Sequence, residues 1–188
     1  MLMTRAQLKP GQTLLIHGIG GGVALSTLKL ARLTGAEGIV TSSSDEKLAR
    51  AKEIGADHTI NYKAGDVART VKEITAGRGV DVVVDTVGAA TWPIDFSAVR
   101  PGGKIVLCGI TTGPEAITNL RVLYWNQLTI MGSTMGSDED FRQVVTAVTA
   151  ARMKPFVDSV HPLENVRDAM GKMEAANQFG KIVLRMSD

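Results

Sequence analysis

TLLIHGIGGGVALS, residues 13–26, is the stretch that most strongly indicates the fold of this chain. The apolar run Thr13 to Ile16 predicts a short buried strand, and a helical pattern begins at residue 22. Between them lie four glycines within five positions: Gly18, Gly20, Gly21 and Gly22. Glycine backbone lets a phosphate approach closely, and a helix N-terminus offers it N–H groups and partial positive charge. The stretch therefore predicts either a phosphate-binding loop or a tight turn without a ligand.

The spacing of these glycines excludes one phosphate-binding motif and partly fits another. No lysine followed by Ser or Thr comes after them, so a P-loop is excluded. Counted from Gly18, the third glycine of the dinucleotide motif G-x-G-x-x-G falls on Val23. Counted from Ile19 it falls on Ala24, an allowed ending in that motif. We interpret Ala24 as a small residue at the point where the helix packs on the strand.

The rest of the chain alternates short apolar strands with amphipathic helices. The predicted strands are 13–17, 38–41, 58–60, 80–84, 104–108 and 128–131. The predicted helices are 22–34, 45–54, 66–75, 91–98 and 138–150. Apolar strands without polar alternation imply a parallel sheet covered on both faces. Right-handed crossovers then give an α/β doubly wound fold, with six strands in the order 3-2-1-4-5-6.

The pattern changes near Pro155. Residues 1–153 are predicted to form the sheet domain, and residues 154–188 a C-terminal tail. The tail has the pattern strand, helix, strand, over 156–160, 163–175 and 181–185. We expect it to be an appendix to the sheet rather than part of it.

Composition argues against several kinds of partner. The 188 residues are 44% hydrophobic and 21% charged, which is typical of a folded domain. A net charge of +2 without a basic run argues against nucleic acid, and no apolar run is long enough to span a membrane. The single cysteine, Cys108, excludes an internal disulfide and favours a cytoplasmic location. The histidines lack metal-ligand spacing, so no metal site is expected. They are His17, His58 and His161.

The end of the second predicted strand indicates which dinucleotide would bind. In NAD-binding folds an acidic residue about twenty positions past the glycines contacts the ribose hydroxyls. Here the segment TSSSDEK, residues 41–47, places Ser42 at that position. A small hydroxyl leaves room for a 2′-phosphate, and Lys47 lies one short turn away to neutralise it. The segment therefore favours NADP(H) over NAD(H).

The same serines can also cap the following helix. Ser43 and Glu46 have the spacing of a capping box, and either Ser43 or Ser44 is expected at the helix N-cap. Capping and phosphate binding are compatible, because one serine can serve both.

Six stretches of the sequence recur in a fixed order in one enzyme superfamily. They are residues 8–36 (LKPGQTLLIHGIGGGVALSTLKLARLTGA), 42–62 (SSSDEKLARAKEIGADHTINY), 79–88 (GVDVVVDTVG), 99–109 (VRPGGKIVLCG), 128–136 (LTIMGSTMG) and 164–184 (ENVRDAMGKMEAANQFGKIVL). On these stretches the chain resembles the cofactor-binding half of the medium-chain dehydrogenase/reductase superfamily, especially its quinone-oxidoreductase-like and zinc-type alcohol-dehydrogenase-like members. The resemblance covers essentially the whole chain. It implies a Rossmann domain that holds NAD(P)H for hydride transfer.

The resemblance also implies a set of cofactor-binding residues. In the quinone-oxidoreductase-like branch the loop runs A-x-G-G-V-G, and residues 19–24 are similar but depart at the last position. The implied residues are Gly20, Gly21, Gly22 and Val23 at the pyrophosphate; Ser42, Ser43, Lys47 and Tyr62 at the 2′-phosphate; and Thr86, Val87, Cys108, Gly109 and Ile110 around the ribose and nicotinamide. No catalytic residue is assigned, because nothing in the sequence suggests a histidine partner for the Cys108 thiol.

Members of the superfamily begin with a separate catalytic domain that carries the substrate pocket. The resemblance thus implies the cofactor part of an NADPH-dependent oxidoreductase acting on a carbonyl, enone or alcohol, inactive without that domain. The alternative is a non-catalytic dinucleotide-binding module. A methyltransferase is a third reading, against which Ser42 argues because an acidic residue is normal there. A homodimer through the edge strand 127–132 is also expected.

Overall fold

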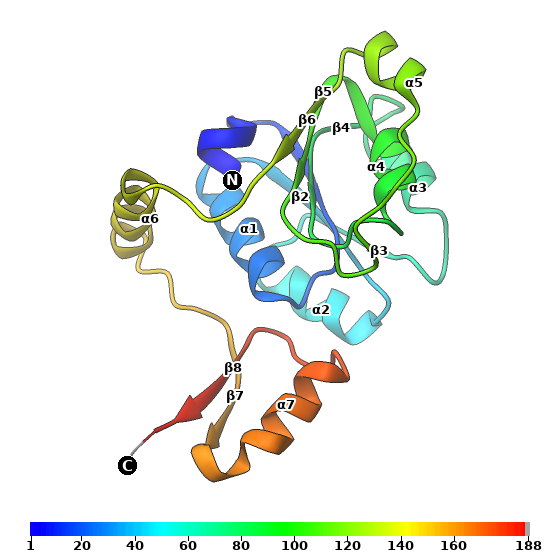
Figure 1. The fold of residues 1–188 in the computed structure, drawn as a ribbon. Helices are drawn as coiled ribbons and strands as arrows, with labels where there is room; N and C mark the ends of the chain where they lie inside the picture. The colour runs from blue at the N-terminus through cyan, green and yellow to red at the C-terminus, as the bar shows by residue number, and fades with distance from the viewer. Residues whose placement is uncertain (187–188) are drawn as a thin grey trace.

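A computed structural model describes residues 1–186 and contains one central parallel sheet. The six strands lie in the order β3-β2-β1-β4-β5-β6, and every neighbouring pair is parallel (Figure 1). The strands are β1 (Thr13–Ile16), β2 (Glu37–Ser42), β3 (His58–Asn61), β4 (Val80–Asp85), β5 (Val99–Leu107) and β6 (Thr129–Gly132). This order confirms the predicted doubly wound fold, whose ligand crevice lies outside the carboxyl ends of the strands.

Helices cover both faces of the sheet. A π-helical turn, η1 (Leu2–Ala6), lies on one face with α1 (Gly22–Leu33) and α2 (Asp45–Glu53). On the other face are α3 (Val67–Ile74) and α4 (Trp92–Ala98). The chain then adds α5 (Leu120–Trp125) and α6 (Asp138–Ala150), and α6 stands to one side of the sheet (Figure 1).

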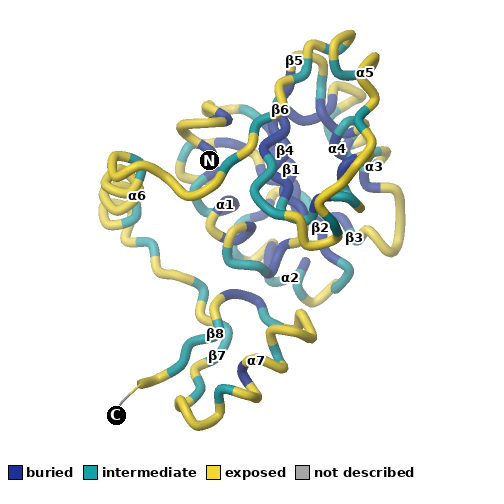
Figure 2. The backbone as a smooth tube through the Cα atoms, viewed as in Figure 1, coloured by how far each residue is buried: buried dark blue, intermediate teal, exposed yellow. Residues whose placement is uncertain are grey.

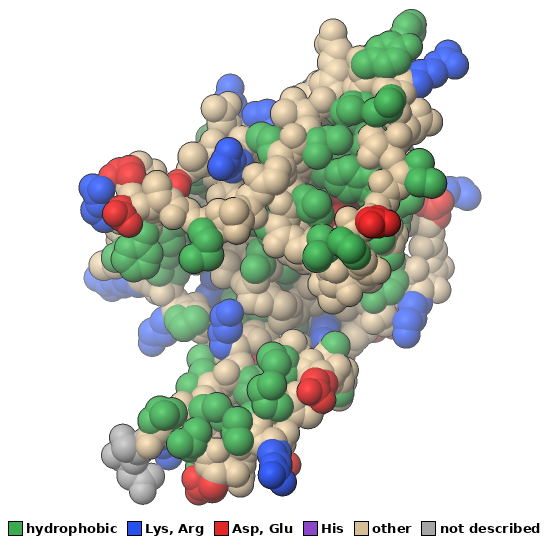
Figure 3. Space-filling model, viewed as in Figure 1, with side chains coloured by type: hydrophobic (Ala, Val, Ile, Leu, Met, Phe, Trp, Pro, Cys, Tyr) green, Lys and Arg blue, Asp and Glu red, His purple; other side chains and the backbone are tan. Residues whose placement is uncertain are grey.

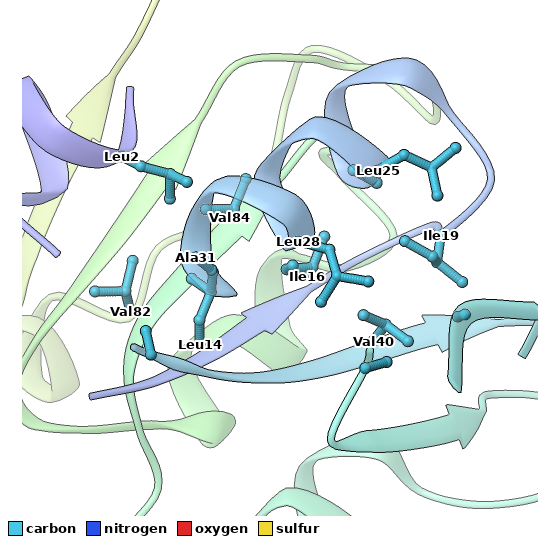
Figure 4. Packing of buried hydrophobic residues seen from close by; sticks show 14 of the residues in the cluster. Leu2, Leu14, Ile16, Ile19, Leu25, Leu28, Ala31, Val40, Val82 and Val84 are labelled. Atoms are coloured by element: carbon cyan, nitrogen blue, oxygen red, sulfur yellow. The ribbon is translucent and has the colours of Figure 1, made fainter. Parts of the chain in front are cut away.

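The core consists of two hydrophobic layers, because successive strand residues point to opposite faces of the sheet. On the α1 side, Leu28 and Ala31 pack over Leu14 and Ile16, all fully buried (Figure 4). On the other side Leu15 packs with residues of α3 and α4. Burial of each large apolar side chain contributes about 1.5–3 kcal/mol, so both faces stabilise the strands that carry the site. Ala24 is also buried in the α1 layer, as expected for a packing position.

The tail forms a second, separate sheet of two parallel strands. Its elements are β7 (Val157–Pro162), a 3₁₀ turn η2 (Leu163–Asn165), α7 (Val166–Glu174) and β8 (Lys181–Arg185). Most of the tail and all of α6 are at least partly exposed (Figure 2). Hydrophobic side chains gather on the surface of the tail (Figure 3). Ala169 and Phe179 are buried, at 4% and 2% exposed, and Phe179 joins the α1-side core.

Three local predictions need correction. The helix α5 was missed; its N-cap is Asn119, whose side chain accepts the Val122 N–H. β5 begins at Val99 rather than 104, because Val99 pairs with Val80 before a bulge in the strand. The sequence V-R-P-G-G at this bulge is typical of a turn, so the first half of the strand was not predicted. Ser44, not Ser43, caps α2 by accepting the Lys47 N–H at 3.3 Å, so the Ser43–Glu46 capping box does not form.

Candidate functional site

The glycine loop leads from β1 into the N-terminus of α1. Gly18 (φ 67°) and Gly20 (φ 130°) adopt left-handed backbone that residues with a Cβ rarely take. Gly21 is the N-cap of α1, and within residues 1–186 no side chain caps this helix. The first-turn N–H groups of α1 are therefore left to an external acceptor. The Val23 side chain is 48% exposed and lines a cavity of about 610 Å³ between α1 and α6.

Three of the four residues predicted to bind the 2′-phosphate lie at the ends of β2 and β3: Ser42, Ser43 and Tyr62. Ser42 is 6% exposed, and its hydroxyl oxygen accepts the Ser44 N–H at 3.1 Å. Ser43 is half-buried. The backbone N–H of Tyr62 donates to the Ser42 carbonyl at 3.1 Å, which holds the half-exposed Tyr62 ring at the same corner.

Lys47 extends from this corner to the glycine loop. Its Nζ donates to the Ala176 carbonyl at 2.5 Å. A Cβ placed on Gly20 would lie 3.5 Å from the same nitrogen. The ammonium group therefore lies between the glycine loop and the tail, where it adds positive charge beside the loop.

The loops after β4 and β5 form the opposite wall. A Cβ placed on Gly18 would contact the Val87 side chain at 3.7 Å, so Val87 lies beside the glycine loop. Gly109 packs on the Thr86 backbone so tightly that a Cβ there would lie 2.5 Å from the Thr86 carbonyl oxygen. The Cys108 N–H donates to the Asp85 carbonyl at 3.0 Å. The structure thus brings these loops together and leaves the Ile110 side chain 53% exposed.

The tail contributes to the site in a way that sequence reasoning missed. The Gly180 N–H donates to the Gly20 carbonyl at 2.9 Å. A Cβ placed on Gly22 would lie 2.6 Å from Lys181 Nζ, so this ammonium group lies at the first turn of α1. No spacing in the sequence relates residue 181 to residue 22, and only the fold shows the contact. Lys47 and Lys181 therefore approach the glycine loop from different elements.

A buried cluster of ionisable side chains lies next to the glycine loop and the loop after β4. Its members are His17, Asp85 and Asp95. His17 Nε2 is 2.8 Å from Asp95 Oδ1, and the two residues are 2% and 0% exposed. Burial, opposed by His17 and reinforced by the charge of Asp85, raises the pKa of Asp95 to about 7. Asp85 is also fully buried, at the end of β4. Burial and the charge of Asp85 raise the pKa of the Cys108 thiol, which opposes thiolate formation there.

Residues 1–186 contain no group of three or more His, Cys, Asp or Glu side chains that could hold a metal ion. Among the same residues, no helix is both long enough and apolar enough to cross a membrane.

The sheet order, the uncapped glycine loop and the two lysines define the class as a dinucleotide-binding dehydrogenase fold of the Rossmann type. The family model described as zinc-binding dehydrogenase matches residues 22–150. The chain therefore belongs to this family, within the medium-chain dehydrogenase/reductase superfamily, and corresponds to its C-terminal cofactor-binding half.

Known relatives agree with this assignment. The zinc-type alcohol dehydrogenase-like protein YogA of Leptosphaeria maculans is 34% identical over 186 residues, covering 95% of this chain and 52% of that protein. The crystal structure of an NAD-dependent alcohol dehydrogenase matches with a TM-score of 0.91 at 34% identity, over 100% of this chain and 55% of the other. A mycobacterial protein in complex with NADPH matches with a TM-score of 0.84 at 26% identity, over 98% and 60%. The chain spans about half the length of these proteins.

Proposed function

We propose that this chain is the NADPH-binding part of an oxidoreductase. The observation that carries the proposal is the uncapped first turn of α1, entered through left-handed glycines and approached by Lys47 and Lys181. A dinucleotide pyrophosphate is an anion that needs N–H donors, close backbone approach and positive charge. Relatives described as NAD-dependent and as bound to NADPH support a nicotinamide dinucleotide.

We expect three regions of the chain to contact three different parts of the dinucleotide. The backbone of residues 20–23, with Lys181, would hold the pyrophosphate. Ser42, Ser43, Lys47 and Tyr62 would hold the adenosine 2′-phosphate, because no carboxylate occupies the position of Ser42. The loops after β4 and β5, from Thr86 to Val87 and from Cys108 to Ile110, would flank the ribose and nicotinamide.

When bound, the reduced dinucleotide would supply a hydride to a carbonyl or enone, and the oxidised dinucleotide would accept a hydride from an alcohol. This chain's part is to bind it, to orient its nicotinamide at the ends of β4 and β5, and to set the preference for NADPH. Turnover is proposed for the whole protein, in which a substrate-binding domain would accompany this half.

Ser42→Asp should reverse the nucleotide preference. A carboxylate at the end of β2 repels a 2′-phosphate and accepts hydrogen bonds from free ribose hydroxyls. We expect the NADPH dissociation constant to rise about tenfold or more and the NADH constant to fall, both measured by fluorescence titration. Ser42→Asn is the matched control of similar size without charge. An unchanged NADPH/NADH ratio in Ser42→Asp would remove the basis for the 2′-phosphate assignment.

We also propose that two copies pair through the edge strand. β6 is the terminal strand of the sheet, and Ile130 in it is 36% exposed. An exposed apolar edge strand favours pairing across a two-fold axis. Light scattering should give twice the mass of one chain, and Ile130→Lys should shift the population toward the monomer. A wild-type monomer at high concentration would contradict the proposal.

A further inference from the structure

The buried His17–Asp95 pair connects α4 to the start of the glycine loop. On one side of the ring, His17 Nε2 lies 2.8 Å from Asp95 Oδ1. On the other side, His17 Nδ1 lies 3.4 Å from the Thr41 hydroxyl at the end of β2. The same hydroxyl oxygen accepts the Gly18 N–H at 3.2 Å. A continuous set of polar contacts therefore runs from Asp95 to the first glycine of the loop.

Asp85 continues this connection to the loop after β4. Its carboxylate accepts the Val87 N–H at 2.7 Å, the Gly88 N–H at 3.2 Å and the Thr91 hydroxyl at 2.9 Å. The neighbouring Asp95 Oδ2 is buried and has no hydrogen-bond partner within residues 1–186. A buried, unpartnered carboxyl oxygen beside a second carboxyl group is costly unless it carries a proton. Asp95 and Asp85 thus lie under the two loops that would flank the dinucleotide.

The cluster of His17, Asp85 and Asp95 holds one proton, and loss of this proton changes the net charge of the cluster. That proton resides on Asp95, which leaves the cluster with a net charge of −1 when Asp85 is ionised. Loss of the proton leaves two buried carboxylates with no cation against them. The pKa of about 7 for Asp95 places this loss near neutral pH. His17 and Asp85 are the ionisable groups that act on Asp95, and Cys108 is the further titratable group beside Asp85.

We propose that the His17–Asp95 pair is a proton-dependent positioning element for the dinucleotide site. With its proton in place, the pair holds the glycine loop and the loop after β4 in the arrangement that binds the ligand. Without it, repulsion between Asp95 and Asp85 loosens both loops and places extra negative charge beneath an anionic ligand. This inference rests on the proposed function, because the ligand is the dinucleotide of the same site.

The test compares NADPH dissociation constants of the wild-type chain and Asp95→Asn between about pH 6 and pH 8.5, at constant ionic strength. Asparagine keeps an oxygen for the His17 ring and puts an N–H donor where Oδ2 has no partner, but it carries no titrating proton. We expect the ratio of the wild-type constant to the variant constant to rise about tenfold over this range. Using one ligand for both proteins cancels the titration of its own phosphates.

A second measurement needs no variant. A ligand that binds the protonated form about tenfold more tightly must raise the apparent pKa of the pair by about one unit on saturation. The ¹⁵N shifts of the His17 ring, followed by NMR with and without NADPH, report this change. A merely structural pair would show the same titration in both states.

The two possible failures are distinguishable. If the wild-type chain binds NADPH, but neither the ratio of constants nor the pH profile of the His17 ring shifts responds, the inference is overturned and the proposed function stands. If the wild-type chain binds no nicotinamide dinucleotide at any pH, the proposed function falls and the inference falls with it. A response of the pH profile of the His17 ring shifts to NADPH supports the inference even if Asp95→Asn does not fold.

Discussion

Gly22→Asp should lower NADPH affinity by about 100-fold or more while leaving the chain folded. The new carboxylate would occupy the first turn of α1 and pair with the Lys181 ammonium, which approaches this position. Repulsion between carboxylate and phosphate at about 4 Å amounts to several kcal/mol near a protein surface, and about 2.7 kcal/mol already corresponds to 100-fold. An acidic residue at a helix N-terminus is itself stabilising, so the melting temperature should not fall.

Ser26→Asp provides the matched control. Ser26 is exposed on the same helix and lines the same cavity as Gly22, and Ser26→Asp adds the same charge one helical turn further from the glycine loop. NADPH titrations of both variants should show the loss in Gly22→Asp alone. Binding by Gly22→Asp within threefold of the wild type would mean that the phosphate does not lie at this helix end.

Asp95→Asn should remove the pH dependence of stability that arises from this buried carboxyl group. The pKa of Asp95 is raised from 3.8 to about 7 in the folded state, so the folded state binds this proton more tightly than the unfolded state. The stabilisation is complete below about pH 4 and is lost as pH rises through about 7. A shift of this size corresponds to about 4 kcal/mol. Relative to wild type, the variant should gain that much stability between pH 4 and pH 8.

Urea unfolding at several pH values measures this difference. Asp138→Asn, an exposed carboxylate in the first turn of α6, is the control and should keep the wild-type profile. Parallel profiles of wild type and Asp95→Asn would show that burial of Asp95 next to Asp85 carries no pH-dependent cost.

The sheet and its order were predictable from the sequence because the strands are apolar on both faces and the helices are amphipathic. The strand 13–16, for example, presents the consecutive apolar residues Leu14, Leu15 and Ile16, which a sheet covered on both faces explains. The helix α5 was missed because its six residues are too few for a periodic signal. Strand β5 was shortened because its first half carries the residues of a turn.

The candidate site was partly predictable for a similar reason. Ser42 and the glycines are close in sequence to strand ends, and parallel strands bring their carboxyl ends to one edge. Lys181 was not predictable, because it reaches Gly22 only through the return of the tail across the loop. His17 and Asp95 lie 78 positions apart, and His17 alone was indistinguishable from a packed residue at a strand end.

Titration of this chain with NADPH, NADH and S-adenosylmethionine, followed by fluorescence, is the most direct measurement of its central function. Saturable binding of NADPH, tighter than that of NADH and with no binding of S-adenosylmethionine, is the predicted result. Binding of S-adenosylmethionine in preference to both dinucleotides, or no binding of either dinucleotide, would contradict the assignment of the glycine loop to a nicotinamide dinucleotide.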